Sequence, residues 1–308
     1  MQLTLSELHL SLRQTVRRLV EQEVAPQAEA IEAGGIPAEL RALLGELDLW
    51  SLTLPESRGG AGLDALAFVL VVEELASASP SLAHRYGVHA GPATAVLAAS
   101  DLDLSPLITG ELASWTDGGL APEAESYFVR ALEKGAEIRS GARVRRVATT
   151  GLRGAALAEH EGGETLAEVP DTGQRWADLA VAAGCLGAGR AALRAALTYA
   201  QERRQFGRAI ASFQAIQFKL ADASALVDAT ELMVWRAATS EEASASAAAR
   251  AFAGRMIGRV ASEALQIHGG YGYTREFPIE RLLRAGRQWD ASPDAPRRVL
   301  ASGALGFP

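Results

Sequence analysis

The N-terminal residues repeat apolar side chains at helical spacing. The first repeat consists of Leu8, Leu12, Val16 and Leu19, with charged and polar residues between them. This spacing predicts an amphipathic helix, because side chains three and four positions apart lie on one face. Ser6 can serve as its N-cap, and Pro26 marks the point where the helix ends or bends.

Three further helices are expected before residue 101. A short one follows Pro37 and extends to Leu47, after which residues 52–63 are dense in glycine and proline, which favours a loop. Asp64 can then cap a strongly apolar helix over residues 66–76, a composition typical of a helix that is buried on most sides. Another helical pattern covers residues 82–100.

The pattern changes between residues 101 and 175. Residues 126–132 and 143–149 carry alternating or β-branched side chains and are bounded by glycine or charged residues, which predicts two short strands. The whole region contains only about 75 residues. It has room for a small sheet but not for a large barrel.

Helical spacing returns after residue 176. One long alanine-rich pattern runs over residues 177–204, and the next helix is lined by Ile216, Leu220 and Val227. A third helix is marked by the repeat of Phe252, Met256, Val260, Ala264 and Ile267. Gly269 and Gly270 should end it, Pro278 can begin a short helix that reaches Leu283, and Pro296 can begin a last one. The expected fold is mainly α, with helices at both ends of the chain around a small β region.

Composition narrows the class of protein. The net charge of −7 and the pI near 5.4 argue against a nucleic-acid partner, although Arg143, Arg145 and Arg146 form one local basic cluster. The single cysteine, Cys185, excludes an internal disulfide and is expected to be a core side chain. No segment approaches the ~20 apolar residues of a membrane span, and none resembles a signal peptide. We therefore expect a cytoplasmic protein.

Two kinds of ligand site lack the spacing they need. The five histidines show no zinc-site spacing with cysteines or carboxylates, so no metal site is expected. Three glycine clusters, at residues 59–62, 184–189 and 269–272, do not follow a strand and open a helix as a Rossmann fingerprint requires. For the first two clusters, close helix packing and turns are the better interpretation.

Several sequence blocks together resemble the acyl-CoA dehydrogenase family. They are YAQERRQFGRAI at 199–210, SFQAIQFKLAD at 212–222 and QIHGGYGYTREFP at 266–278, preceded by LPESRGGAGLD at 54–64 and VVEELASASPSLA at 71–83. The resemblance implies an N-terminal helical domain over residues 1–105, a shortened middle β domain over 106–175 and a C-terminal four-helix-type domain over 176–308. It also implies a dimer or tetramer built on the C-terminal helices.

The resemblance further implies an FAD site that crosses a subunit interface. Arg203 would reach the FAD pyrophosphate of a neighbouring subunit with Phe206 beside it, since a guanidinium offers paired donors to phosphate oxygens. Phe213 and Gln214 would contact the adenosine side. The partner's ADP moiety would also be approached by Gln266, Gly269 and Gly270. The alternative is that Arg203 pairs with Glu202 or another acid, and that the glycines only cap a helix.

The family's catalytic base is missing at both of its known positions. Residues 288–298 read QWDASPDAPRR and contain no glutamate, and the second position, at the start of the long helix, is Ala177. The family's arginine beside that position is Asp178 here. The local carboxylates, Asp290 and Asp294, are weak candidates for a base, because a small misplacement can cost about 10²-fold in rate. Their alternative role is that of solvated aspartates.

The middle domain departs from the family as well. The hallmark Leu-Thr-Glu-Pro-Gly-Ala-Gly-Ser-Asp stretch is absent, and LITGELASWTDGG at 107–119 keeps only its lead-in. TGLRGAALAEHE at 150–161 resembles the closing strands of the family's barrel, so the strands between them are missing. Trp115 is either a relic of the flavin-facing strand or, as we favour, a packing residue.

Two functions from different classes follow. The first is an FAD-dependent oxidoreductase that dehydrogenates an acyl-CoA thioester, with lost or reduced activity. The second is a non-catalytic structural or regulatory subunit that pairs with itself or with a complete dehydrogenase and helps hold the partner's FAD. A flavin monooxygenase needs no such base, but nothing in the sequence supports it.

Overall fold

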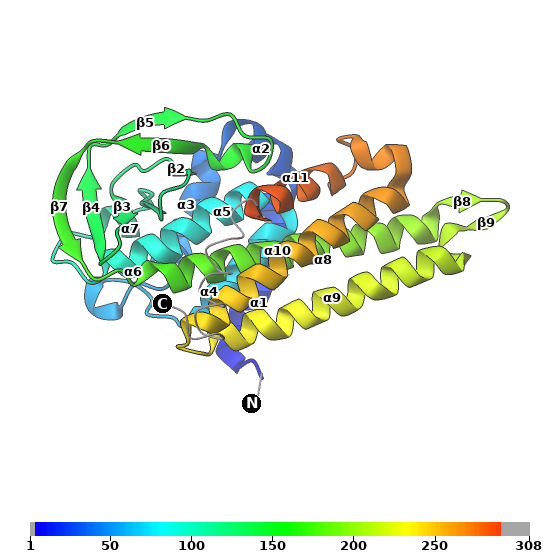
Figure 1. Ribbon diagram of the computed structural model, residues 1–308, viewed down its shortest axis with the longest axis horizontal. Helices are drawn as coiled ribbons and strands as arrows, with labels where there is room; N and C mark the ends of the chain where they lie inside the picture. Colours follow the sequence, from blue (N-terminus) through cyan, green and yellow to red (C-terminus); the bar gives the residue numbers. More distant parts are fainter. Residues whose placement is uncertain (1–3, 291–308) are drawn as a thin grey trace.

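The computed structural model describes residues 4–290. Three long helices, α8 (Gly173–Glu202), α9 (Gln214–Ala238) and α10 (Ala243–His268), run side by side along the molecule (Figure 1). The β region lies at one end of these helices, and the small hairpin of β8 (Arg204–Gln205) and β9 (Arg208–Ala209) lies at the other. The mainly α fold predicted from the sequence is confirmed.

The N-terminal helices begin at the caps that the sequence indicated. The Ser6 side chain accepts a hydrogen bond from the His9 amide, and the Asp64 carboxylate accepts one from the Ala67 amide. The helices of this region are α1 (Glu7–Leu19), α2 (Ala28–Gly34), α3 (Ala38–Glu46), α4 (Ala65–Ala78), α5 (Pro80–Val88), α6 (Thr94–Leu97) and the single turn α7 (Ser105–Ile108).

The single helix expected over residues 82–100 is wrong in detail. A π-helical turn, η4 (His89–Ala93), separates α5 from α6. Pro92 lies inside this turn and has no amide hydrogen to donate, so an unbroken α-helical ladder cannot form there. The break also positions His89, which accepts a hydrogen bond from the Ala113 amide at 2.9 Å through Nδ1.

The β region consists of two small sheets. One has the strand order β1-β3-β4-β7 and the other the order β2-β6-β5. β1 pairs in parallel with β3, whereas the other pairs are antiparallel. The strands are β1 (Ser114–Thr116), β2 (Ala121–Pro122), β3 (Phe128–Ala131), β4 (Ala136–Ser140), β5 (Arg143–Arg146), β6 (Leu157–Glu161) and β7 (Glu164–Val169).

The sequence pattern identified β3 and β5 but missed most of their partners. β7 reads ETLAEV and β4 reads AEIRS, so charged side chains occupy positions where an alternating strand pattern would need apolar ones. Glu137 of β4 is neutralised by Arg130 and Arg139, and this pairing permits the charge within the sheet. Such cross-strand compensation is not visible in a single segment.

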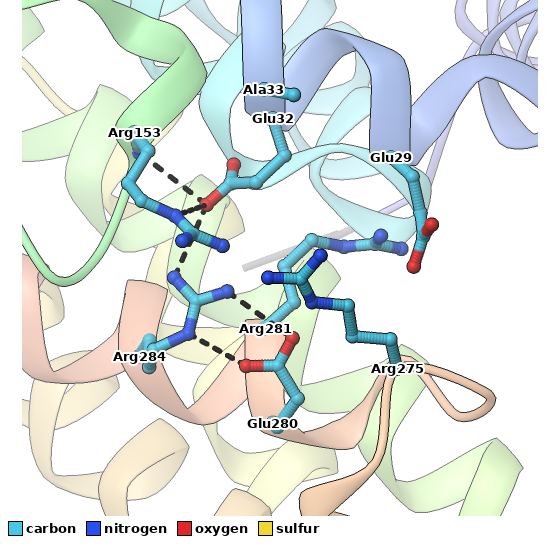
Figure 2. A pocket seen from close by; sticks show the side chains of 8 residues that line it. All are labelled: Glu29, Glu32, Ala33, Arg153, Arg275, Glu280, Arg281 and Arg284. Carbon is cyan, nitrogen blue, oxygen red and sulfur yellow. Dashed lines mark hydrogen bonds and ion pairs between the residues drawn. The ribbon is translucent and has the colours of Figure 1, made fainter.

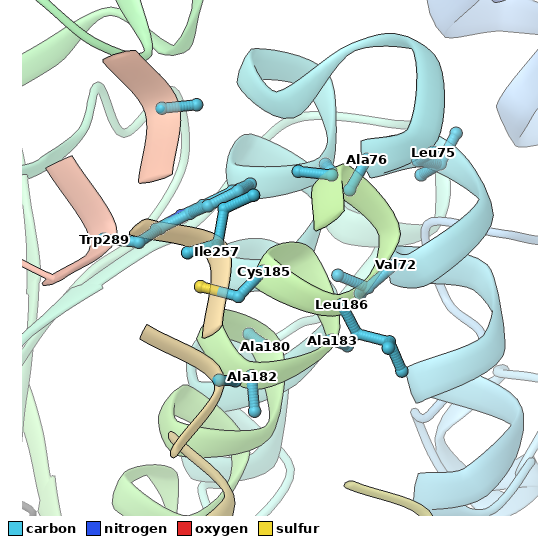
Figure 3. Close-up of a cluster of buried hydrophobic side chains, with 14 of the residues drawn as sticks. Val72, Leu75, Ala76, Ala180, Ala182, Ala183, Cys185, Leu186, Ile257 and Trp289 are labelled. Atoms are coloured by element: carbon cyan, nitrogen blue, oxygen red, sulfur yellow. The ribbon is translucent and has the colours of Figure 1, made fainter. Parts of the chain in front are cut away.

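α8 forms the centre of the core. Figure 3 shows Cys185 and Leu186 of this helix with Val72, Leu75 and Ala76 on one side and Ile257 and Trp289 on the other. Cys185 is fully buried, as expected for a core side chain.

The expectation that no segment is apolar enough to span a membrane is wrong for α8. By length and composition alone this helix could cross one, but 67% of its most apolar window is buried in the protein. Its hydropathy comes from alanine, leucine, valine and cysteine residues, and its glycines allow α4 and α10 to pack closely against it.

The glycines of α8 are used for this close packing, as predicted. A Cβ atom at Gly187 would collide with the Glu73 carbonyl oxygen of α4, and one at Gly189 would lie 2.7 Å from the Met256 sulfur of α10. At Gly184 it would lie 2.8 Å from the Trp289 ring. Side chains larger than hydrogen therefore have no room on these faces of α8.

The last described helix, α11 (Ile279–Asp290), is longer than predicted. The expected end at Leu283 is wrong, because Ala285, Gly286 and Trp289 continue the buried face of the helix. Gly269 ends α10 with φ +61°, as predicted, and a 3₁₀ segment, η7 (Gly269–Tyr273), follows. Pro296 lies outside the described residues.

Candidate functional site

A pocket of about 490 Å³ lies at the junction of the C-terminal ends of α8 and α10. It contains three of the residues that the family resemblance assigned to FAD: Arg203, Gly269 and Gly270. Its remaining lining residues are Tyr199, Gln205, Ile210, Ile267, His268, Tyr271 and Thr274. The fold therefore brings a guanidinium group and an exposed glycine backbone into one space.

The φ of +61° explains Gly269 as the cap that ends α10, but neither Gly269 nor Gly270 is packed against another part of the chain within residues 4–290. A Cβ atom at Gly269 or Gly270 would meet no other atom within 4 Å. The backbone is thus open to close approach by a ligand. Arg203 lies with its guanidinium carbon 5.9 Å from the Tyr271 ring centre and makes no ion pair within residues 4–290, so the alternative pairing with Glu202 is not found there.

Four other predicted contact residues lie around the pocket rather than in it. Phe206, at the tip of the β8–β9 hairpin, is 93% exposed and has a φ of +50°. Its ring meets that of Phe213 edge-on at 6.3 Å between centroids, and the Arg208 guanidinium covers Phe213 at 4.2 Å. Gln214 begins α9, and Gln266 lies on the last turn of α10, both exposed. None of these four side chains lines the pocket at Arg203.

A second, smaller cavity lies between α5, β1, α8 and α10. Its volume is about 100 Å³, and it is lined by His84, Val88, Trp115, Thr116, Asp117, Leu120, Ala121, Pro122, Ala177, Ala180, Val181 and Arg250. Ala177, the position of the family's alternative base, thus faces this cavity with a methyl group. Trp115 is buried, which agrees with a packing role, although its indole nitrogen has no partner within the described residues.

Asp178 is held in an internal ion pair and does not line the cavity. Its carboxylate accepts hydrogen bonds from Arg250 at 2.9 Å, Gln174 at 3.1 Å and Ser246 at 3.5 Å, and the residue is 3% exposed. Burial raises the pKa of the Asp178 carboxyl, and the Arg250 guanidinium opposes this shift. The carboxylate is thus directed toward Arg250 and Gln174 and is not among the lining residues of the cavity.

His84 is the imidazole of the cavity, and its protonation state follows from one neighbour. The Trp289 indole donates to His84 Nδ1 at 3.2 Å, and because an indole can only donate, the ring hydrogen must lie on Nε2. Burial and, less strongly, the Arg250 charge lower the pKa of His84 to about 4. At neutral pH this histidine is an uncharged donor and not a base.

Trp289 of α11 holds His84 by its hydrogen bond but is not itself a lining residue of the cavity. Its ring lies against Gly184 of α8, and Asp290 follows it with a carboxylate oxygen that would lie 2.9 Å from a Cβ atom at Gly254 of α10. Asp290, a weak candidate for the base, is therefore packed against α10 and is not a lining residue of the cavity. Asp294, the other candidate, lies outside the described residues.

Asp117 is the carboxylate that does line the cavity, and the sequence interpretation missed it. It follows β1 directly and is exposed at the cavity mouth. The signal was present, because Asp117 lies in the stretch that departs from the family's hallmark motif. His84 and Arg250 were missed because they are brought to α8 from helices about 90 and 70 residues away in the chain.

The residues present fit one part of a flavin nucleotide and not the other. The pocket at Arg203 offers a cation, open backbone and aromatic rings to a pyrophosphate and an adenosine. The cavity at His84 is several-fold smaller than the about 300–1,000 Å³ of ordinary small-molecule pockets, so the tricyclic flavin ring does not fit there.

Comparisons with known proteins agree with the fold and with the sequence blocks. Residues 6–100 match the model for the acyl-CoA dehydrogenase N-terminal domain, and residues 174–288 match the model for the C-terminal domain. The chain is 30% identical to a probable acyl-CoA dehydrogenase, YngJ, of Bacillus subtilis, with 89% of this chain and 90% of that protein covered.

It is also 30% identical to a 3-sulfinopropanoyl-CoA desulfinase of Paraburkholderia xenovorans, with 98% and 96% covered. That alignment spans 374 positions, more than the 308 residues of this chain, so the relative carries residues that this chain lacks.

The butyryl-CoA dehydrogenase of Megasphaera elsdenii has the same fold, with a TM-score of 0.86 at 22% identity, and the match covers 99% of this chain and all of that one. Members of this family use FAD. The helical domains at both ends, the matched relatives and the shared fold lead to one conclusion: the chain belongs to the acyl-CoA dehydrogenase family.

Proposed function

We propose that this chain is a non-catalytic subunit that holds the ADP part of a partner's FAD and does not itself dehydrogenate an acyl-CoA. The observation that carries this proposal is the contrast between two of its cavities. The pocket at Arg203, Gly269 and Gly270 is open and suited to a nucleotide, whereas the cavity at His84 and Ala177 is small and has no positioned base among residues 4–290.

The composition of the small cavity supports this proposal. Proton abstraction from a thioester requires a base within hydrogen-bond reach of the reacting carbon's proton. Within residues 4–290 the titratable lining groups are His84, Asp117 and Arg250. His84 is a neutral donor, Arg250 is bound to Asp178, and Asp117 is solvated at the mouth.

The exposed apolar side chains indicate where a partner would pack. Phe206, Phe218 and Leu232 of the C-terminal helical region and Tyr271 and Tyr273 of η7 are all exposed. Large apolar side chains on neighbouring elements are typical of an interface. We propose a complete acyl-CoA dehydrogenase as the partner, since it would supply a flavin-ring site larger than the cavity that residues 4–290 form at His84, and we place the complex in the cytoplasm.

The proposal is tested by flavin content. The chain is purified alone and after co-expression with a complete acyl-CoA dehydrogenase of the same organism, and the FAD per complex is read from the absorption spectrum. We expect colourless protein alone and a yellow complex whose FAD affinity falls roughly tenfold or more in Arg203→Gln.

Arg259→Gln is the matched control, because Arg259 is an exposed arginine of α10 that pairs with Asp222. It should leave the flavin content unchanged. Stoichiometric FAD on the isolated chain, bleached by an acyl-CoA, would contradict the proposal.

A dehydrogenase of reduced activity is the second candidate, and the position of Asp117 is the observation in its favour. If Asp117 acts as the base, acyl-CoA must reduce a flavin in the presence of the chain, and Asp117→Asn must abolish that reduction while flavin binding persists. The relative named for desulfination shows that the family's named activities on CoA thioesters extend beyond dehydrogenation, so 3-sulfinopropanoyl-CoA belongs in the substrate panel.

A further inference from the structure

A third hollow, of about 200 Å³, lies where α2, the 3₁₀ turn η5 (Arg153–Ala155) and the segment from Arg275 to Arg284 meet (Figure 2). It shares no lining residue with either cavity described above. Apart from Ala33, every lining residue is charged: Glu29, Glu32, Arg153, Glu280, Arg275, Arg281 and Arg284. Four guanidinium groups and three carboxylates therefore face one space.

Two of the carboxylates are fully engaged by the protein. Glu32, which is buried, accepts hydrogen bonds from Ser81 and from Arg284 at 3.3 Å, and it pairs with Arg153 at 3.6 Å. Glu280 accepts two hydrogen bonds from Arg284, at 2.7 and 3.2 Å. Arg284 thus neutralises Glu280, which lies on the same helix. Arg153 and Arg284 together neutralise Glu32.

Arg275 and Arg281 remain without an ion pair within residues 4–290. Arg281 donates one bond, to the Ala78 carbonyl at 3.3 Å, while its Nε is buried without a partner. Burial lowers the pKa of Arg281 against the pull of nearby carboxylates. Figure 2 shows both guanidinium groups reaching into the hollow, with Glu29 as the remaining acid at its rim.

We propose that this hollow binds a phosphate group, either as inorganic phosphate or as a phosphomonoester. Two guanidinium forks that share one space match the several acceptor oxygens and the double charge of a phosphate. The hollow has room for about six water molecules at ~30 Å³ each, so a phosphate enters without any side chain having to leave. Bound there, the anion joins the segment before α11 to α11 itself, through Arg275 and Arg281.

Isothermal titration of the full chain with inorganic phosphate, at constant ionic strength set with chloride, tests the site. We expect saturable binding at one site per chain. Arg275→Gln should weaken it roughly tenfold or more, because each charge-assisted bond contributes strongly. Glu29→Gln should strengthen it, since it removes the unpaired acid at the rim. Titration with glycerol 3-phosphate separates the two sources. If glycerol 3-phosphate displaces inorganic phosphate, the site accepts a phosphomonoester; if it does not, the site binds the free ion.

The controls keep the result interpretable. Arg275 is exposed, so its variant should fold, and circular dichroism verifies this. Arg259→Gln removes the same charge elsewhere on the surface and should bind phosphate like the unaltered chain. Absence of saturable phosphate binding overturns the proposal, and so does an affinity in Arg275→Gln and in Arg281→Gln that is unchanged from that of the unaltered chain.

Discussion

At the scale of single residues, polar side chains around α8 form hydrogen bonds and ion pairs with one another. Asp178 binds Arg250, and His84 accepts from Trp289. A buried carboxylate is tolerated only while its charge is matched and its oxygens are hydrogen-bonded. The resemblance implied an arginine at position 178; the acid found there takes its opposite charge from Arg250 of α10.

Removing Arg250 should therefore destabilise the fold strongly. In Arg250→Met the Asp178 carboxylate would remain buried without its partner, and we expect the free energy of unfolding to fall by about 3–5 kcal/mol. Urea denaturation measures this value. Arg259→Met breaks the exposed pair with Asp222 and should cost at most about 1 kcal/mol. Equal effects of the two variants would refute a special role for the buried pair.

At the scale of elements, the fold depends on how closely α8 approaches its neighbours. α4 reaches α8 at Gly187, where the Glu73 backbone occupies the space that a Cβ atom would need. α11 reaches it at Gly184 through Trp289, whose indole also donates a hydrogen bond to His84. The position of the His84 ring thus depends on how α11 packs against α8.

Gly187→Val should separate α4 from α8. Its side chain would meet backbone rather than a movable side chain, so we expect a loss of about 1–3 kcal/mol or more in unfolding free energy. Thermal and urea unfolding measure the loss. Gly119→Ala is the control, because a Cβ atom there meets nothing within 4 Å. If the two variants proved equally stable, the α4–α8 contact would be looser than described.

At the scale of the whole molecule, buried neutral histidines couple stability to pH. Burial lowers the pKa of His89 and of His84 to about 4, whereas an unfolded histidine titrates near 6.5. The unfolded chain therefore binds more protons between these values, and stability falls as the pH drops from about 6.5 to about 4. His89 is fully buried and would lose its bond from the Ala113 amide on protonation.

For His89 alone this loss amounts to about 3 kcal/mol across the window. Unfolding free energies measured from pH 7.5 to pH 4.5 should show it, and His89→Gln should flatten the slope although it lowers the stability at neutral pH. The pKa values of Asp64 and Glu74 are also lowered in the folded chain, so these carboxylates bind fewer protons there than in the unfolded chain. The stability lost for this reason appears only below about pH 4.5, the ordinary pKa of Glu74. An unchanged slope in His89→Gln would show that His89 does not titrate on unfolding.

The sequence alone determined the features that depend on neighbouring residues. Ser6 and Asp64 predicted the starts of their helices because an N-cap acts within three residues. The glycines of α8 predicted close packing by their spacing. The absence of a glutamate from residues 288–298 can likewise be read from the sequence without any structure. Arg203, Gly269 and Gly270 share a pocket because they end two helices that the family blocks had already identified.

Only the tertiary structure decided what surrounds those features. The pairing of Asp178 with Arg250, the Trp289 ring on Gly184 and the position of Asp117 each join segments far apart in the chain. β4 and β7 are strands because of cross-strand partners for Glu137 and its neighbours, which no local pattern displays. Charges and rings act over a few ångströms in space, so their consequences appear only once the helices are packed.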